Sequence, residues 1–295
     1  MTAMTIIRLE NVNYDYGAGL SFETHALDNI SLDIEEGSIV GLIGPTGSGK
    51  STLLQQMNGL LRPSSGSVYF RGEDISSRSF DSRTLCSRVG IVFQYPEYQL
   101  FSEDVISDVM FGPLNIGLSH DDARRRAEEA LQMMGISGDE LKLSPFELSG
   151  GQKRRAAIAG VVAMEPEVLV LDEPTAGLDT AGRKDLIDTI ISMRGKRKMT
   201  VIWSSHSMED MASYVERLIV MYKGAVVRDG TPADVFRDAQ YLEQIGLAVP
   251  EASYMIRELR TRGIGVEEGA ITLEQAADSI MAAWNRSRKN GLEQL

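Results

Sequence analysis

The sequence of 295 residues contains one cysteine, Cys86, and no long apolar run. A single thiol cannot form a disulfide within the chain, which is typical of a reducing cytosol. Its apolar stretches, such as residues 168–171, are far shorter than the ~18 residues that span a bilayer. The first residues, MTAMTIIRLENV, do not have the basic-then-apolar order of a secretory signal. These absences predict a cytosolic protein that does not itself cross the membrane.

Basic residues are also in deficit, with 30 Lys and Arg against 42 Asp and Glu, a formal net charge of −12. A large nucleic-acid footprint requires a basic face, so the composition disfavours nucleic acid as a partner. Association with a membrane through another protein stays open. The sequence also lacks internal repeats, low-complexity segments and long coiled-coil patterns.

Short apolar runs alternate with helical patterns along most of the chain. This alternation predicts an α/β fold with a mostly parallel sheet. Buried parallel strands are predicted at residues 38–43, 89–93, 168–171 and 200–203. Patchy alternation over residues 6–37 predicts an N-terminal antiparallel β subdomain, and a hairpin is predicted at 218–222 and 225–227. A helical subdomain is expected over about 95–165, between the second and third of the predicted parallel strands.

The pattern changes after Gly230, which predicts one large domain over 1–230 and a helical appendage over 231–295. Helices are expected to start at Pro232, near Pro250 and at Thr272, where Gln275 completes a capping-box spacing. The last helix has an apolar stripe that either packs on its own domain or forms a subunit interface. The stripe consists of Leu273, Ala276, Ala277, Ile280, Met281 and Trp284.

The sequence GPTGSGKS at residues 44–51 follows a predicted strand and precedes a predicted helix, as the P-loop mechanism requires. Its glycines let backbone N–H groups surround phosphates, and the helix N-terminus adds a partial positive charge. Lys50 can reach the β- and γ-phosphates, and Ser51 can ligate Mg²⁺. The predicted ATP-binding segment is Gly44, Pro45, Thr46, Gly47, Ser48, Gly49, Lys50, Ser51 and Thr52.

Two acids follow the predicted strand at 168–171, in a Walker B pattern. Asp172 is expected to hold Mg²⁺, and Glu173 to act as the general base that polarises the attacking water. Two acids at a strand end can also be a solvated terminus. The neighbouring P-loop favours the catalytic interpretation.

Residues 148–152, LSGGQ, match the signature of the ABC ATPases, and residues 6–230 resemble that family. The resemblance implies that Ser149, Gly150, Gly151 and Gln152 reach the γ-phosphate of ATP held by a second subunit. The physical basis is again anion binding at a helix N-terminus. One ATP would therefore be enclosed by two chains.

The same resemblance assigns the smaller motifs. Gln94 corresponds to the Q-loop, a Mg²⁺ contact that couples to the transmembrane partner. Asp179 ends the D-loop at 176–179, in which Ala176 replaces the common serine. His206 corresponds to the switch histidine and acts with Lys50 and Glu173 in catalysis.

By the same resemblance, Tyr16 corresponds to the aromatic that stacks on adenine, with Tyr14 as the alternative. Ser51, Gln94 and Asp172 are the implied Mg²⁺ ligands.

Segments at 94–101, 111–118, 144–147 and 160–166 resemble the ATPases of energy-coupling factor (ECF) importers, in the cobalt-type group and its second, A-prime, subunit type. The resemblance implies uptake of a vitamin or transition-metal ion, powered by ATP and Mg²⁺ at the cytoplasmic face of the membrane. Implied partners are a second ATPase subunit, as a heterodimer or a homodimer, a membrane T component and a substrate-binding S component. Tyr95, Pro96 and Tyr98 are expected to form part of the docking surface for the T component.

Three alternatives remain. A conventional ABC importer or exporter ATPase is disfavoured by the appendage and the segment at 94–101. A non-transport ABC ATPase acting in DNA repair or on the ribosome is disfavoured by the lack of coiled coils, the single domain and the negative charge. A P-loop metabolite kinase is disfavoured by LSGGQ.

Overall fold

The computed structural model describes residues 4–17, 19, 23–77 and 80–292. Residues 1–3, which begin the N-terminal segment without a secretory-signal pattern, lie outside the described residues. The strands are β1 (Thr5–Tyr16), β2 (Thr24–Glu35), β3 (Ile39–Ile43), β4 (Ser65–Phe70), β5 (Glu73–Asp74), β6 (Val89–Val92), β7 (Val168–Asp172), β8 (Thr200–Ser204), β9 (Arg217–Tyr222) and β10 (Ala225–Gly230). The α-helices are α1 (Lys50–Met57), α2 (Ser82–Arg88), α3 (Val105–Asn115), α4 (His120–Met133), α5 (Gly150–Val162), α6 (Thr180–Arg197), α7 (Met208–Tyr214), α8 (Pro232–Arg237), α9 (Ala239–Gln244), α10 (Glu251–Thr261) and α11 (Leu273–Leu292).

The larger sheet has the strand order β10-β9-β3-β8-β7-β6. Every pair in it is parallel except β9 with β10, which confirms the predicted α/β class. Strands β3, β7 and β8 are buried along their whole length, because helices cover both faces. The carboxyl ends of β3, β8, β7 and β6 meet at one edge, where ligands of open α/β sheets bind.

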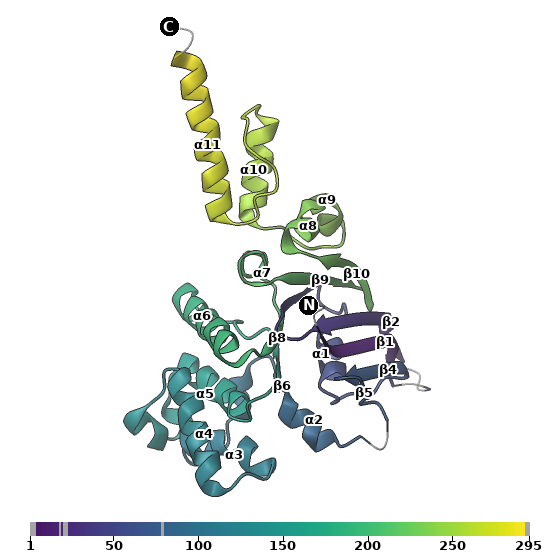
Figure 1. The fold of residues 1–295 in the computed structure, drawn as a ribbon, viewed down its shortest axis with the longest axis vertical. Coiled ribbons are helices and arrows are strands. Elements are labelled where there is room, and N and C mark those ends of the chain that lie inside the picture. Colours follow the sequence, from purple (N-terminus) through teal and green to yellow (C-terminus); the bar gives the residue numbers. More distant parts are fainter. Residues whose placement is uncertain (1–3, 18, 20–22, 78–79, 293–295) are drawn as a thin grey trace.

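The smaller sheet is antiparallel, with the order β2-β1-β4-β5. Alternating residues of β1, including Ile7 and Leu9, face a core that also contains Leu53 and Leu54 of α1. Val40 of β3 belongs to the same core. Helix α1 therefore lies between the two sheets, which fixes the direction of the loop that precedes it (Figure 1).

A helical group formed by α3, α4 and α5 lies beside the end of the large sheet that carries β6 (Figure 1). Its small apolar side chains, among them Ala127, Ala130 and Ala159, are fully buried in the main core. Small residues let these helices approach closely. The group presents the N-terminus of α5 away from α1 (Figure 1).

The C-terminal region divides into two packing units. Phe236 of α8 and Leu242 of α9 belong to the main core, whereas α10 and α11 form a separate small core around Ile256 and Ala276 (Figure 1). The three predicted helix starts agree with α8, α10 and α11, and Gln275 donates its amide to Thr272 as the capping box requires. The domain boundary at 230 remains a prediction.

The predicted apolar stripe lies on α11, and its members differ in burial. Ala276 and Ile280 pack on α10, whereas the other members form an exposed row along the helix. We call this row the α11 stripe; it consists of Leu273, Ala277, Met281 and Trp284. Among the described residues, no helix combines the length and apolar character needed to cross a bilayer.

Candidate functional site

The loop between β3 and α1 has the geometry of a phosphate cradle. Gly47 and Gly49 have φ of +78° and +99°, a region that favours glycine. A Cβ on Gly49 would lie 2.5 Å from the carbonyl oxygen of Ala26, so no larger residue fits there. The hydroxyl of Ser48 is buried without a hydrogen-bond partner. Such a loop, open at Thr46 and Gly47, is shaped to donate backbone N–H groups to an anion.

Lys50, the first residue of α1, folds back into this loop. Its Nζ donates to the carbonyl oxygens of Gly44 at 2.7 Å and Pro45 at 3.3 Å. Only 6% of the residue is exposed, and burial lowers the pKa of the ammonium, although the charges of Glu173 and Asp172 act to raise it. A phosphate in the loop would give the ammonium a better partner than two carbonyls.

Glu173 is where the ends of three neighbouring strands meet. Its Oε2 accepts from Nε2 of Gln94, after β6, at 2.9 Å. Its Oε1 lies 2.7 Å from Nε2 of His206, after β8. The backbone of Glu173 has φ of +51°, a conformation that non-glycine residues rarely adopt and that recurs at functional sites. The structure therefore brings together three of the predicted site residues.

The hydroxyl of Ser204 supports both acids of the Walker B pair. It donates to Oδ1 of Asp172 at 2.6 Å and accepts from the amide of Glu173 at 3.0 Å. Asp172 and Ser204 are paired across β7 and β8, which explains the contact. Sequence reasoning missed Ser204, although a serine in register with an acid at adjacent strand ends is a recognisable signal.

The signature residues begin α5. Ser149 is the N-cap and forms a reciprocal capping box with Gln152. Gln152 is fixed in turn by Glu140, which accepts from its Nε2 at 2.6 Å. Ser149 and Gly150 are exposed, and α5, which they begin, lies in the helical group, apart from α1 (Figure 1).

The D-loop borders an open depression beside Glu173 and His206. Asp179 caps α6, where its carboxylate accepts from the amide of Gly182 at 2.8 Å. The depression has a volume of about 460 Å³ and is also lined by Ala176 and Gly177. Its lining is mostly polar and lacks deep walls, as expected of half an interface.

Tyr16, the last residue of β1, lies beside Thr52 in the first turn of α1. Its hydroxyl lies 3.1 Å from the hydroxyl of Thr52, and its ring packs edge-on against Tyr14. Tyr16 is the more exposed of the two tyrosines. The structure therefore places an exposed ring beside the first turn of α1.

Arg154 is a second residue that sequence reasoning missed. The side chain is buried in α5 and forms a bidentate pair with Glu97 in the segment after Gln94, at 2.7 and 3.0 Å. It also donates to the carbonyl oxygens of Pro174 and Ala176 in the D-loop. One guanidinium thus joins the Q-loop segment, the signature helix and the D-loop. Its place two residues after LSGGQ gave no signal, because a basic residue in a helix is ordinarily exposed.

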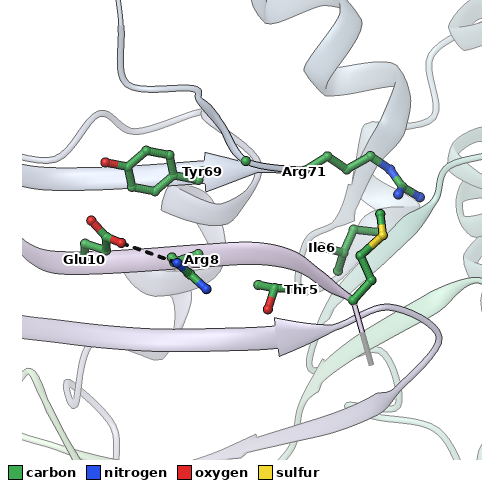
Figure 2. A pocket seen from close by; sticks show the side chains of 8 residues that line it. Thr5, Ile6, Arg8, Glu10, Tyr69 and Arg71 are labelled. Carbon is green, nitrogen blue, oxygen red and sulfur yellow. Dashed lines mark ion pairs between the residues drawn. The ribbon is translucent and has the colours of Figure 1, made fainter. Parts of the chain in front are cut away.

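A different hollow on the outer face of the small sheet contains none of these motif residues. It has a volume of about 440 Å³ and is lined by residues of β1, by Tyr69 of β4 and by Arg71, which follows β4 (Figure 2). Arg8 pairs with Glu10 at 3.8 Å and with Asp33 at 2.7 Å, and Arg71 pairs with Glu36 and Glu167. Both cations of the hollow therefore already have acidic partners.

The described residues contain no cluster of three or more histidine, cysteine or acidic side chains that would form a dedicated metal cage. Mg²⁺ is usually held by one or two carboxylates together with substrate phosphates, so a cage is not required. Asp172, one of the predicted ligands, is buried at the edge beside the phosphate loop, and Ser51 is exposed in the first turn of α1. These oxygen ligands fit a hard cation held jointly with ATP.

Residues 27–176 of the chain match the family described as ABC transporter. The chain is 48% identical over 284 residues to the energy-coupling factor transporter ATP-binding protein EcfA2 of Caldanaerobacter subterraneus subsp. tengcongensis, covering 96% of this chain and 99% of the relative. It is 48% identical over 276 residues to the protein of the same name from Clostridium perfringens, covering 93% and 97%.

Two solved structures are also similar. One is cbiO1 from Clostridium perfringens, part of the ABC transporter complex cbiONQ, with a TM-score of 0.71, 39% identity, and coverage of 86% of this chain and 99% of that chain. The other is the ATP-binding cassette MJ0796, as a dimer in a post-hydrolysis state bound to ADP and Pi, with a TM-score of 0.68, 29% identity, and coverage of 77% and 99%.

Proposed function

Because the chain belongs to the ABC transporter family and is an ATP-hydrolysing subunit of the energy-coupling factor type, we propose that its motif residues form one jaw of an ATP-driven clamp that powers uptake of a vitamin or a transition-metal ion. The observation that carries the proposal is the meeting of Gln94 and His206 at the carboxylate of Glu173, beside the phosphate loop. A carboxylate held on both oxygens is positioned to take a proton from water.

In the proposed mechanism, the phosphate loop and Lys50 hold the β- and γ-phosphates of ATP. Glu173 orients and deprotonates the water that attacks the γ-phosphate, and His206 donates a hydrogen bond to the charge that develops there. Ser204 holds Asp172 and the amide of Glu173 in register throughout. Tyr16 stacks on the adenine in this proposal.

Mg²⁺ is proposed to be held by Ser51, Asp172 and, after it releases Glu173, Gln94. The cation would neutralise charge on the transferred phosphoryl group. Asp172 is buried with one oxygen bonded to Ser204, which supports a fixed ligand direction.

The second jaw comes from another ATPase subunit in this proposal. Ser149 and Gly150 are exposed at the start of α5, far from this chain's own loop (Figure 1). Four motif residues, Ser149 to Gln152, would contact the γ-phosphate across the interface, with Asp179 in the D-loop between the jaws. We propose a heterodimer with a related subunit, with a homodimer as the alternative. The α11 stripe supplies a further contact between the subunits.

A membrane T component is the proposed partner of the segment after Gln94. Tyr98 is 84% exposed and Tyr95 is exposed beside it, while Pro96 is buried and fixes the turn. Large apolar side chains presented in this way are typical of docking surfaces. The T component would hold the chain at the cytoplasmic face of the membrane, and an S component would select the substrate.

The proposed partnership is tested by tagging the full-length chain, solubilising it with its membrane and identifying what co-purifies. A T-type membrane protein, a second ATPase subunit and an S component are expected. Recovery with a conventional permease pair, or with ribosomes, would reject the proposed assembly. A Tyr98→Ala variant should retain the second ATPase subunit and lose the T component.

A further inference from the structure

The N-terminus of α10 depends on a residue outside its own helix. Pro250 occupies the N-cap position and provides no capping side chain. The amide of Glu251, the first residue of α10, instead donates to Oε1 of Glu209 in α7, at 3.3 Å. A carboxylate at this end of a helix also meets the positive end of its dipole. The small C-terminal unit of α10 and α11 is thereby bonded to α7.

Glu209 lies three residues after His206 and shares the same short segment. Its other oxygen, Oε2, accepts from the hydroxyl of Ser207 at 3.5 Å, and Ser207 is the N-cap of α7. The amide of Ser207 donates to the hydroxyl of Ser205 at 3.0 Å, which completes the turn around the histidine. One oxygen of Glu209 therefore accepts a hydrogen bond from the C-terminal unit, and the other accepts one from the turn that contains His206.

The same carboxylate faces the reaction side. Glu209 lines the depression that also contains Glu173 and His206. Apolar contacts attach the C-terminal unit to the body independently, because Ile271 and Tyr254 pack against the main core. Loss of the Glu209 bond would therefore leave the unit attached and remove only its polar link to the turn.

From these contacts we propose that Glu209 is a positioning residue through which the C-terminal unit of α10 and α11 sets the orientation of His206 and so the rate of ATP hydrolysis. A partner subunit that shifts α10 would be sensed at the switch histidine through this bond. The inference rests on the role proposed above for His206.

Glu251→Pro tests the hydrogen bond between Glu251 and Glu209 directly, because proline removes the N–H donor together with the glutamate side chain. Proline is favoured at the first position of a helix. Pro250 has φ of −55° and ψ of 144°, the extended conformation that a residue before proline adopts. Glu251→Ala is the matched control, since it removes the same side chain and keeps the amide.

Steady-state ATP hydrolysis is measured on the full-length protein purified with its bound partners. Glu251→Pro is expected to lower kcat about two- to fivefold with KM for ATP and Tm unchanged, the range typical of one helix-terminus charge contact. Glu251→Ala should match wild type. Glu209→Ala should reproduce the loss, and the double variant Glu209→Ala with Glu251→Pro should lose no more than Glu209→Ala alone.

Equal kcat for Glu251→Pro and Glu251→Ala, or fully additive losses in the double variant, would overturn the inference. A change in KM for ATP or in Tm without a change in kcat would also overturn the inference, since the hydrogen bond would then have a purely structural role. His206→Ala separates this failure from failure of the proposed mechanism: it abolishes turnover if His206 acts on the phosphate, whatever the Glu251 variants show.

Discussion

Glu173 is the general base of the proposed mechanism, and its carboxylate contacts both Gln94 and His206. We predict that Glu173→Gln lowers ATP turnover by about 100-fold or more, since the amide cannot accept the proton of the attacking water. Binding should persist because the phosphate loop is intact. Phosphate release measures the first effect, and size-exclusion chromatography with ATP should show accumulated closed dimers. Glu128→Gln, an exposed isosteric change in α4, is the control. Wild-type turnover in Glu173→Gln would exclude the general-base role.

Arg154 makes a second prediction at this scale, on stability. Its side chain and that of Glu97 are only 4% and 16% exposed. Arg154→Met should lower the free energy of unfolding by about 3–5 kcal/mol, because it leaves a buried carboxylate without a partner. Arg124→Met removes an exposed pair with Glu128 and should cost about 0.5 kcal/mol or less. Urea unfolding at pH 7 measures both changes, and equal losses in the two variants would contradict the prediction.

The same pair has a pH dependence with a definite sign. Burial acts to raise the pKa of Glu97, but the hydrogen bonds and charge of Arg154 outweigh it and lower the pKa below its usual range. Because the pKa of Glu97 is lower in the folded than in the unfolded protein, the ionised carboxylate stabilises the fold at pH values above the ordinary glutamate pKa of about 4.3. This stabilisation is lost as the pH falls through the folded pKa. The difference in stability between wild type and Arg154→Met should therefore narrow on acidification below about pH 4. A difference that stays constant from pH 7 to that range would show that the ion pair is not its cause.

The site residues at the strand ends were predictable from the buried strands that precede them, while the residues that support them were not. Gln94, Glu173 and His206 each lie within three residues of the end of a short apolar run, and parallel strands bring such positions to one edge. Arg154 was missed because burial of a cation depends on a partner 57 positions away in the chain. Periodicity reports which face of an element is apolar, and it does not report long-range ion pairs.

At the scale of elements, we expect the phosphate loop between β3 and α1 to lose ATP binding when a glycine with positive φ is replaced. Gly49→Ala should abolish ATP binding, because φ is +99° and the new Cβ would lie 2.5 Å from the carbonyl of Ala26. Gly195→Ala in α6 is the control: beyond its chain neighbours and the nearby backbone of α6, no described atom lies within 4 Å of the new Cβ, and stability should rise by about 0.5–1 kcal/mol. Nucleotide titration and thermal unfolding test the two variants. Normal ATP affinity in Gly49→Ala would mean that the loop has room that the structure does not show.

Helix ends were predicted less well than helix identities. Leu60 stands at helical spacing from Leu53 and Met57, but α1 ends at Met57 and Leu60 is exposed. Gly59 has φ of +74°, and its amide donates to the carbonyl of Gln56, which ends the helix in a left-handed turn. The pair Asn58-Gly59 was an available stop signal. Strands β4 and β5 were not predicted, because β4 begins with Ser65-Gly66-Ser67 and β5 has only two residues, so neither carries much apolar alternation.

For the molecule as a whole, the proposed clamp depends on the separation of the phosphate loop from the signature. The phosphate loop precedes α1, which lies between the two sheets, and α5 with its signature belongs to the helical group (Figure 1). If the proposed clamp is right, ATP hydrolysis depends on assembly of two subunits as well as on the site residues of one chain. The small core of α10 and α11 extends away from both half-sites, where it can join subunits without blocking the clamp (Figure 1).

The α11 stripe gives the last prediction. Leu273, Met281 and Trp284 are each more than half exposed, and Trp284 is 61% exposed, an arrangement that costs solubility unless a partner covers it. Trp284→Asp should weaken association between ATPase subunits by about 100-fold, the loss of a central aromatic contact worth ~2–4 kcal/mol. Asn285→Asp adds the same charge at the next, polar position and should leave association unchanged. Sedimentation of the purified subunits without nucleotide measures both, because without ATP the clamp does not contribute. Equal association in the two variants would place the interface elsewhere and leave the stripe to another component of the transporter.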